Sequence, residues 1–353
     1  MNAVPFKDAP ARPGVHRYLL ADVFTHRPFE GNPLAIFPHG GEVPPESMAP
    51  IARELNLSET VFILPPEDPA HAARLRIFTP GRELPFAGHP TVGAACALAL
   101  LGRVPMTRGT GAGDALEWAE LTLGEGAGPV PVRVTRRRDG TGYTAHLETP
   151  RLPESGPPPP PSDTLARILS LSPDDMEGGA WSAEGVSCGV PFLIIPVRGT
   201  DALARIRVDL EGWRKSLASW WAPHLYVIAR ETGAWEPGAR EPSGSGRIRA
   251  RMFAPELGVG EDPATGSAAA ALAGYLAARE ASGSETFRWR IQQGVDMGRP
   301  GVMETEVEMK EGRIVRVRVG GGSVFYGEGR LFMGGTCRRE ARARPMPRLR
   351  HAP

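Results

Sequence analysis

The sequence predicts an α+β fold of two similar halves, each with strands wrapped around a central apolar helix. A segment at residues 76–98 recurs at residues 251–272, with matching Phe-x-Pro and Glu-Leu pairs and a shared Pro-x-x-Gly. A repeat of such long period indicates two like units. Residues 91–101 and 266–278 are apolar on all sides, which is typical of helices enclosed by other elements. Five consecutive prolines at 157–161 separate the two copies and favour a stiff connector.

The repeat and the proline run also suggest domain limits. We expect the first half to span residues 15–150 and the second half residues 164–322, with a linker at 151–163. Residues 323–333 form an alternating, apolar segment, and we expect this strand to return and complete the first half. The basic tail at 337–353 has no apolar period and is expected to be disordered.

Hydrophobic periodicity and turn residues define the other expected elements of the first half. The predicted strands are 15–24, 33–37, 60–64 and 75–78, with a turn at 29–33 and a short amphipathic helix at 45–55. Two stretches rich in Gly, Pro and Ser, 103–113 and 235–246, are expected to be mobile loops.

Each copy of the repeat ends as the start of a helix. His89 and Asp262 stand where a capping residue is expected, and each is followed by a proline that suits the first helical position. The first turn of a helix has unpaired N–H groups and about half a positive charge. Two such starts that face one cleft would bind an anion, most simply a carboxylate. We therefore expect the functional site to lie between the halves.

Composition excludes several classes of function. A net charge of +1 over 353 residues gives no reason to expect a nucleic-acid or membrane partner. No segment resembles a signal peptide or an uninterrupted membrane span, so a soluble cytoplasmic protein is expected. Three widely spaced cysteines argue against a disulfide framework and against a cysteine metal site. No metal-binding or nucleotide-binding motif is present in the sequence, and we expect no metal and no cofactor.

Five short motifs follow one another along the chain. They are Asn-Leu-Ser-Glu-Thr at 56–60, Phe-Thr-Pro to Gly-His-Pro-Thr at 78–91, Glu-Asp-Pro-Ala-Thr-Gly-Ser at 261–267, Gln-Gly-x-x-Met-Gly-Arg-Pro at 293–300 and Val-Gly-Gly at 319–321. In this order, from about residue 18 to 333, they resemble the PhzF family of phenazine-biosynthesis-like isomerases. The resemblance implies the diaminopimelate-epimerase-like fold of two pseudo-symmetric halves, a site in the cleft between them, and a homodimer.

Glu59 is the first candidate catalytic residue. Its position alone favours a surface or capping residue in a turn before a strand. A carboxylate in a partly dry cleft suits proton transfer, because desolvation raises its pKa toward working pH. The glutamate of this motif is the general acid/base in PhzF-like enzymes, so the resemblance implies that role for Glu59.

His89 and Asp262 are the other two candidate catalytic residues. Asp262 could be an ordinary helix cap, whereas histidine is a poor cap and suggests another purpose. The resemblance implies that both side chains hydrogen-bond the substrate near its reacting carbons. Asn32 fits a turn and a cleft-lining polar group equally well. The candidate substrate-binding residues are Gly88, Thr265, Gly266, Ser267 and Asn32.

The cysteines limit the chemistry. Related epimerases use two opposed thiols at the starts of their central helices, but segments 87–90 and 264–266 contain no cysteine here. Two-thiol epimerisation is therefore excluded by residue type. Cys96 is expected in the core. Cys188 stands where PhzF-like sequences often carry Thr, so its thiol either lies near the cleft or is a small buried residue.

The resemblance implies a cofactor-independent isomerase that shifts a proton within a small unsaturated carboxylic acid, bearing an amino or hydroxy group, in secondary metabolism. Two alternatives stay open. One is a hydrolase or lyase that cuts a carbon–carbon bond on the same scaffold. The other is a small-molecule binding protein that has lost turnover, although the intact set of Glu59, His89, Asp262 and Ser267 argues against it.

Overall fold

The computed structural model describes most of the chain. The described residues are 14–109, 117–231, 246–257, 259–280 and 285–333. The predicted disordered tail at 337–353, nearly all of the predicted loop at 235–246 and the end of the loop at 103–113 lie outside the described residues.

Eight strands of the first half close into a barrel around helix α2 (Gly88–Leu100). Each strand pairs with the next, and the last pairs with the first. In ring order they are β1 (Val15–Val23), β2 (Asn32–Phe37), β3 (Glu59–Leu64), β4 (Ala73–Phe78), β7 (Glu117–Glu125), β8 (Gly128–Arg136), β9 (Tyr143–Glu148) and β18 (Arg313–Phe332). The interior of an eight-stranded barrel is narrow. Small residues around α2 allow it to fit, and every residue from Gly88 to Ala99 is buried.

Three further elements lie around this barrel. They are α1 (Pro45–Leu55), β5 (Glu83–Leu84) and β6 (Thr107–Arg108). The apolar face of α1 packs on Phe37, Phe62 and Phe78 in a small separate cluster. A proline at N1 begins α1, and Asn56 ends it in the left-handed conformation.

Strands of the second half enclose helix α6 (Gly266–Glu280), which is buried along almost its whole length. They run in the order β10 (Glu154–Ser155), β11 (Glu184–Ser187), β12 (Pro191–Pro196), β13 (His224–Glu231), β14 (Gly246–Ala254), β16 (Thr286–Gln293), β17 (Gly301–Lys310) and β18, with β15 (Val259–Asp262) beside β14. Helices α3 (Ser162–Leu169), α4 (Gly199–Arg205) and α5 (Leu210–Ser216) contribute to a second core with the outer faces of β12 and β13. Among the described residues, no helix combines the length and apolarity needed to cross a membrane.

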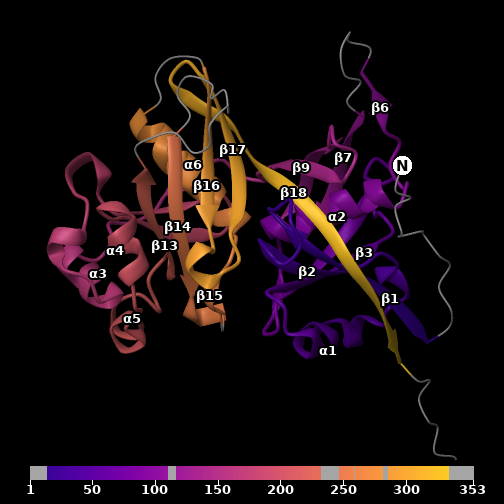
Figure 1. Cartoon of the computed structure of the whole chain (residues 1–353), viewed down its shortest axis with the longest axis horizontal. Helices are drawn as coiled ribbons and strands as arrows, with labels where there is room; N and C mark the ends of the chain where they lie inside the picture. Colours follow the sequence, from indigo (N-terminus) through magenta and orange to yellow (C-terminus); the bar gives the residue numbers. More distant parts are fainter. Residues whose placement is uncertain (1–13, 110–116, 232–245, 258, 281–284, 334–353) are drawn as a thin grey trace, which may run out of the picture.

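Strand β18 joins the two halves (Figure 1). Its first part pairs with β17, its middle pairs with β9, and residues 323–332 pair with β1. One continuous strand therefore belongs to both sheets, so the halves cannot separate without breaking its ladder. The main buried cluster is likewise continuous and includes residues of both α2 and α6.

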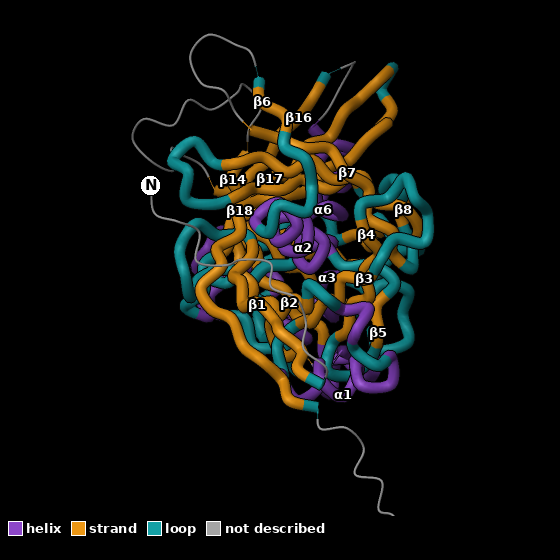
Figure 2. Tube along the Cα trace, turned by 90° about the vertical axis from the view of Figure 1, so that its right-hand side faces the viewer, coloured by secondary structure: helices purple, strands orange, loops and turns teal. Residues whose placement is uncertain are grey.

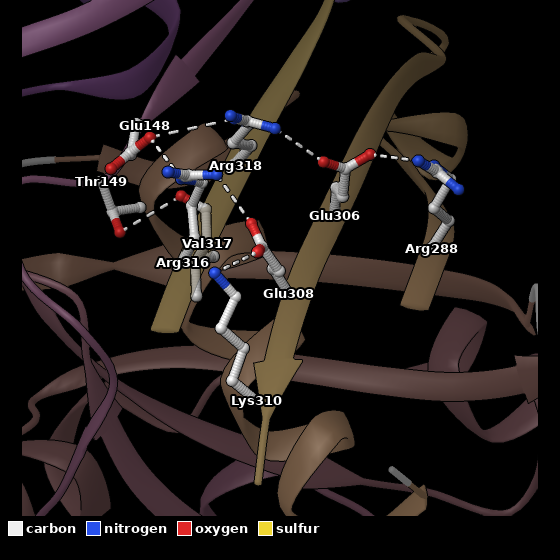
Figure 3. A network of polar contacts seen from close by, with 9 residues as sticks. All are labelled: Glu148, Thr149, Arg288, Glu306, Glu308, Lys310, Arg316, Val317 and Arg318. Atoms are coloured by element: carbon white, nitrogen blue, oxygen red, sulfur yellow. Dashed lines mark hydrogen bonds and ion pairs between the residues drawn. The ribbon is translucent and has the colours of Figure 1, made fainter. Parts of the chain in front are cut away.

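Charged side chains beside the crossing alternate in sign (Figure 3). Glu148 of β9 lies 2.9 Å from Arg316 of β18, and Arg318 lies 2.9 Å from Glu306 of β17. Glu306 also pairs with Arg288 of β16. Exposed pairs of this kind contribute at most about 1 kcal/mol each, so they favour the register of β9, β18, β17 and β16 more than they stabilise the fold.

The proline-rich segment at 151–163 lies against the second half. Its strand β10 pairs with β11. A methyl group added to Gly274 of α6 would come within 2.4 Å of Pro153, and one added to Gly156 within 2.2 Å of Trp221. Packing therefore fixes this segment at both contacts.

Candidate active site

Helices α2 and α6 lie one behind the other in Figure 2, and they meet at their N-termini. A methyl group added to Gly88 would lie 2.9 Å from the Cα of Gly266 and 3.0 Å from the backbone nitrogen of Ser267. Only glycine permits so close an approach of two backbones. The unpaired N–H groups of both first turns therefore lie side by side, and their positive ends add.

The predicted helix caps are wrong. Helix α2 begins at Gly88, so His89 and Pro90 lie within its first turn, and the capping position is taken by Ala87 without a side-chain bond. Asp262 is the last residue of β15, four residues before α6 begins. The chain bends at Pro263 and has no regular structure at residues 264–265, while the Asp262 carboxylate bonds to Asn32 of the other half and does not cap the helix.

A cavity of about 390 Å³ opens at this junction, a size typical of small-molecule sites. Both halves contribute to its wall. Its polar residues include Ser58, Glu59 and His89 from the first half, and Asp262, Thr265 and Ser267 from the second. Gly88 and Gly266 also line it, and apolar residues such as Phe86, Phe192 and Met252 complete the wall. All the predicted site residues except Asn32 therefore lie on one cavity.

Glu59 and His89 face each other within this wall. The His89 Nε2 lies 3.2 Å from the Glu59 Oε2, yet neither atom has a hydrogen-bond partner among the described residues. Burial lowers the pKa of His89 to about 3, so the imidazole is neutral and the contact is not an ion pair. Burial, and the charge of Asp262, raise the pKa of Glu59 well above its ordinary value. Two unpartnered buried polar groups are costly in a fold and are available to a ligand.

Asp262 has a different environment. Its carboxylate accepts hydrogen bonds from the Asn32 amide at 2.9 Å, from the Thr265 hydroxyl and from Ser58. These donors lower its pKa, but burial outweighs them and raises it to about 6. Because the donors favour the charged form, Asp262 ionises more readily than Glu59. Two neighbouring carboxyl groups with pKa values pushed apart are typical of an acid–base pair.

Asn32 lies behind the cavity, which corrects its prediction as a cleft-lining group. It is fully buried, and its amide donates to Asp262 and to the backbone oxygen of Ala264. Gln293 supports the same loop: its amide nitrogen bonds to the Asp262 backbone oxygen at 2.7 Å and to the Thr265 hydroxyl at 3.0 Å. Gln293 was part of a sequence motif, but only the tertiary contacts give it this role.

The two described thiols, Cys96 and Cys188, do not line this cavity. Cys188 is buried, and burial raises its pKa to about 12. Cys96 lies inside α2, and burial raises its pKa to about 12 as well. Both are therefore protonated thiols at neutral pH and cannot serve as bases. Of the two interpretations of Cys188, the buried one holds. Among the described residues, no group of three His, Cys, Asp or Glu side chains could hold a metal ion.

Glu125, the last residue of β7, was not expected from the sequence. Its carboxyl lies 2.5 Å from the Thr91 hydroxyl, which is also 2.6 Å from the Ala87 carbonyl. A hydroxyl has one hydrogen, so both contacts are satisfied when Glu125 is protonated and donates. Burial raises the pKa of Glu125 to about 8, although Thr91 and the backbone of Ala87 lower it. The Ala127 amide also bonds to Pro85, so this hairpin tip holds the loop before α2.

Replacing Glu125 with glutamine should remove a pH dependence of stability. A folded pKa of about 8, above the ordinary value of 4.5, gives stability that is complete below pH 4.5 and is lost as pH rises through 8. Between pH 5 and 8 the free energy of unfolding of Glu125→Gln should therefore rise relative to the wild type by roughly 2 to 4 kcal/mol. Urea unfolding at several pH values measures this.

The matched control for Glu125→Gln is Glu120→Gln, on the same strand but exposed. Because this side chain is exposed, Glu120→Gln should not show a rise of this size. If Glu125→Gln behaves in the same way, the Glu125 carboxyl is ionised in the folded protein.

Fold and cavity together define a small-molecule site at the junction of two strand-enclosed helices. The family model of phenazine biosynthesis-like proteins, PhzC-PhzF, matches residues 21–329. The chain therefore belongs to the PhzF family.

Named relatives agree with this assignment. An uncharacterized isomerase of Mesorhizobium japonicum is 39% identical over 90% of this chain and 98% of its own length. The trans-2,3-dihydro-3-hydroxyanthranilate isomerase of Pseudomonas aeruginosa is 33% identical over 90% of this chain and 100% of its own length. A crystal structure of a PhzF-family protein of Bacillus anthracis has the same fold, with a TM-score of 0.75 and 23% identity over 90% of this chain and 98% of that one. The predicted family and the predicted enzyme class, isomerase, are confirmed.

Proposed function

We propose that this chain is a cofactor-independent isomerase that moves a proton within a small unsaturated carboxylic acid, on a diaminopimelate-epimerase-like fold of two pseudo-symmetric halves. One observation carries the proposal: Glu59, His89 and Asp262 share a single cavity with the starts of two helices. The activity named for the Pseudomonas aeruginosa relative has the same chemistry, because its substrate is an unsaturated ring acid with amino and hydroxy groups.

The helix starts would bind the substrate carboxylate. Gly88, His89, Gly266 and Ser267 line the cavity at the two first turns, where backbone N–H groups are unpaired and the local potential is positive. The carboxylate would thereby be held in one orientation between the halves. Its neighbouring carbons would then lie against Glu59, which comes from the start of β3.

Glu59 would transfer the proton. In its ionised form it removes a proton from an sp³ carbon, the electron pair moves through the conjugated system, and the same carboxyl returns the proton to another carbon. No atom is gained or lost. Burial raises the pKa of Glu59, which makes its carboxylate a stronger base than one in water. The neutral imidazole of His89 and the more readily ionised Asp262 would hydrogen-bond the amino or hydroxy groups that orient the ring.

The test is incubation in deuterated water with trans-2,3-dihydro-3-hydroxyanthranilate and a panel of cyclic and dienoic amino and hydroxy acids, followed by NMR. We expect a substrate whose double bonds shift and whose product carries solvent deuterium. Products of carbon–carbon cleavage would instead assign a lyase or hydrolase. Binding to the panel without exchange or conversion of any member would assign a binding protein.

A further inference from the structure

The cavity has a second polar region that the proposed acid–base group does not use. His224, the first residue of β13, lines the cavity and is only 4% exposed. Its Nδ1 is buried without a hydrogen-bond partner among the described residues. A buried imidazole in a core normally has its nitrogens satisfied. A ligand that forms the missing hydrogen bond would explain why the His224 imidazole lies in the wall of a cavity.

His224 has a defined place relative to the proposed acid–base group. It pairs in register with Phe192, and the two rings lie 5.8 Å apart. Tyr226 is two residues further along β13 and shares its face. Tyr226 pairs with Met252 of β14, and Met252 pairs with Asp262, so Tyr226 and Asp262 lie in one row across the sheet. His224 is therefore displaced from that row by about 7 Å along the strand.

Two charges of opposite sign stand near His224. Arg82, from the turn before β5, and Glu256, from the second half, lie 4.0 Å apart, and both line the cavity. Glu256 raises the pKa of His224 and Arg82 lowers it, while burial, the largest effect, lowers it below its ordinary value. The imidazole is thus neutral near pH 7. A neutral ring offers hydrogen bonds but carries no charge to attract a second carboxylate.

We propose that His224 is a substrate-binding and specificity-determining residue, which hydrogen-bonds an uncharged polar substituent, a hydroxyl or keto group, on the acid whose carboxylate lies at the helix starts. The inference deepens the proposed function and rests on it. It assigns two regions of the cavity wall different tasks in recognition. The helix starts bind the carboxylate of any small acid, whereas His224 selects among such acids by a group remote from it.

The test compares ligands with and without that substituent. Calorimetry would measure the affinities of benzoate and of 2-, 3- and 4-hydroxybenzoate for the wild type and for His224→Phe, which keeps a ring beside Phe192. We expect at least one hydroxybenzoate to bind the wild type about tenfold more tightly than benzoate. In His224→Phe this preference should fall to about twofold or less, with the affinity for benzoate unchanged.

Two further variants act as controls. His146→Phe removes a partly buried histidine of β9 that bonds to Glu304 outside this cavity, and it should keep the preference. His224→Gln retains a hydrogen-bonding group and should keep part of the preference for a hydroxybenzoate. This variant tests the inference even if His224→Phe does not fold. A preference of equal size in His224→Phe, or none in the wild type, would overturn the assignment of His224 alone. If the wild type bound none of the four acids, the carboxylate site of the proposed function would fail with it.

Discussion

Replacing Glu59 with glutamine is expected to reduce turnover by roughly a hundredfold or more, while ligand affinity changes only a few-fold. Glutamine keeps the shape of the side chain and one carbonyl oxygen, but it cannot accept a proton. The cavity wall and the helix starts are unchanged, so the carboxylate of the substrate should still bind. Exchange of the substrate's acidic hydrogen with deuterated water should fall in parallel, which NMR measures without needing the product.

The same cavity offers a matched control for Glu59→Gln. Glu83 also lines it, but hydrogen bonds of 2.7 Å to Arg76 lower its pKa. An ionised, paired carboxylate is a weak base, so Glu83→Gln should keep turnover within a few-fold. If Glu59→Gln still exchanged the substrate's acidic hydrogen at a near wild-type rate, Glu59 would not be the group that transfers the proton. The role would then pass to His89 or Asp262, because the buried, protonated thiol of Cys188 cannot take it.

Short-range patterns were sufficient to predict both enclosed helices. Alanine, glycine and cysteine around α2 and α6 leave no polar face, and such helices must be surrounded. The repeat also indicated that His89 and Asp262 hold comparable places, and both line the cavity. These inferences needed only the patterns within short segments and the likeness of one segment to another.

Long-range contacts account for what the sequence could not predict. An Asp-Pro pair is a good local helix cap, but Asp262 instead bonds to Asn32, 230 residues away. Stability lost on replacing Asp262 would thus come from this buried network and not from a cap. Glu125 and His224 belong to no motif, and their places depend on how β7 and β13 pair. The sequence of a strand does not determine which strands pair with it, so no local pattern marked these two side chains.

Replacing Gly88 with alanine is expected to abolish ligand binding and to lower the free energy of unfolding by roughly 1 to 3 kcal/mol. The new Cβ would lie 2.9 Å from the Cα of Gly266 and 3.0 Å from the nitrogen of Ser267. Both are backbone atoms, which cannot rotate away, so α2 and α6 must move apart. Alanine is the better helix former by up to about 1 kcal/mol, but this gain is smaller than the cost of overpacking.

The decisive comparison for Gly88→Ala is Gly260→Ala. Gly260 lies in β15 of the same site region, and a methyl group added there would meet no atom within 4 Å. Urea unfolding and calorimetric titration with a substrate-like acid should show Gly260→Ala close to the wild type and Gly88→Ala impaired in both. Once the helix starts are separated, their N–H groups no longer surround one carboxylate. The loss of binding free energy should therefore exceed the loss in the free energy of unfolding. If Gly88→Ala bound the acid normally, the paired first turns would not be its anion site, because their spacing is the one feature that this methyl group must change.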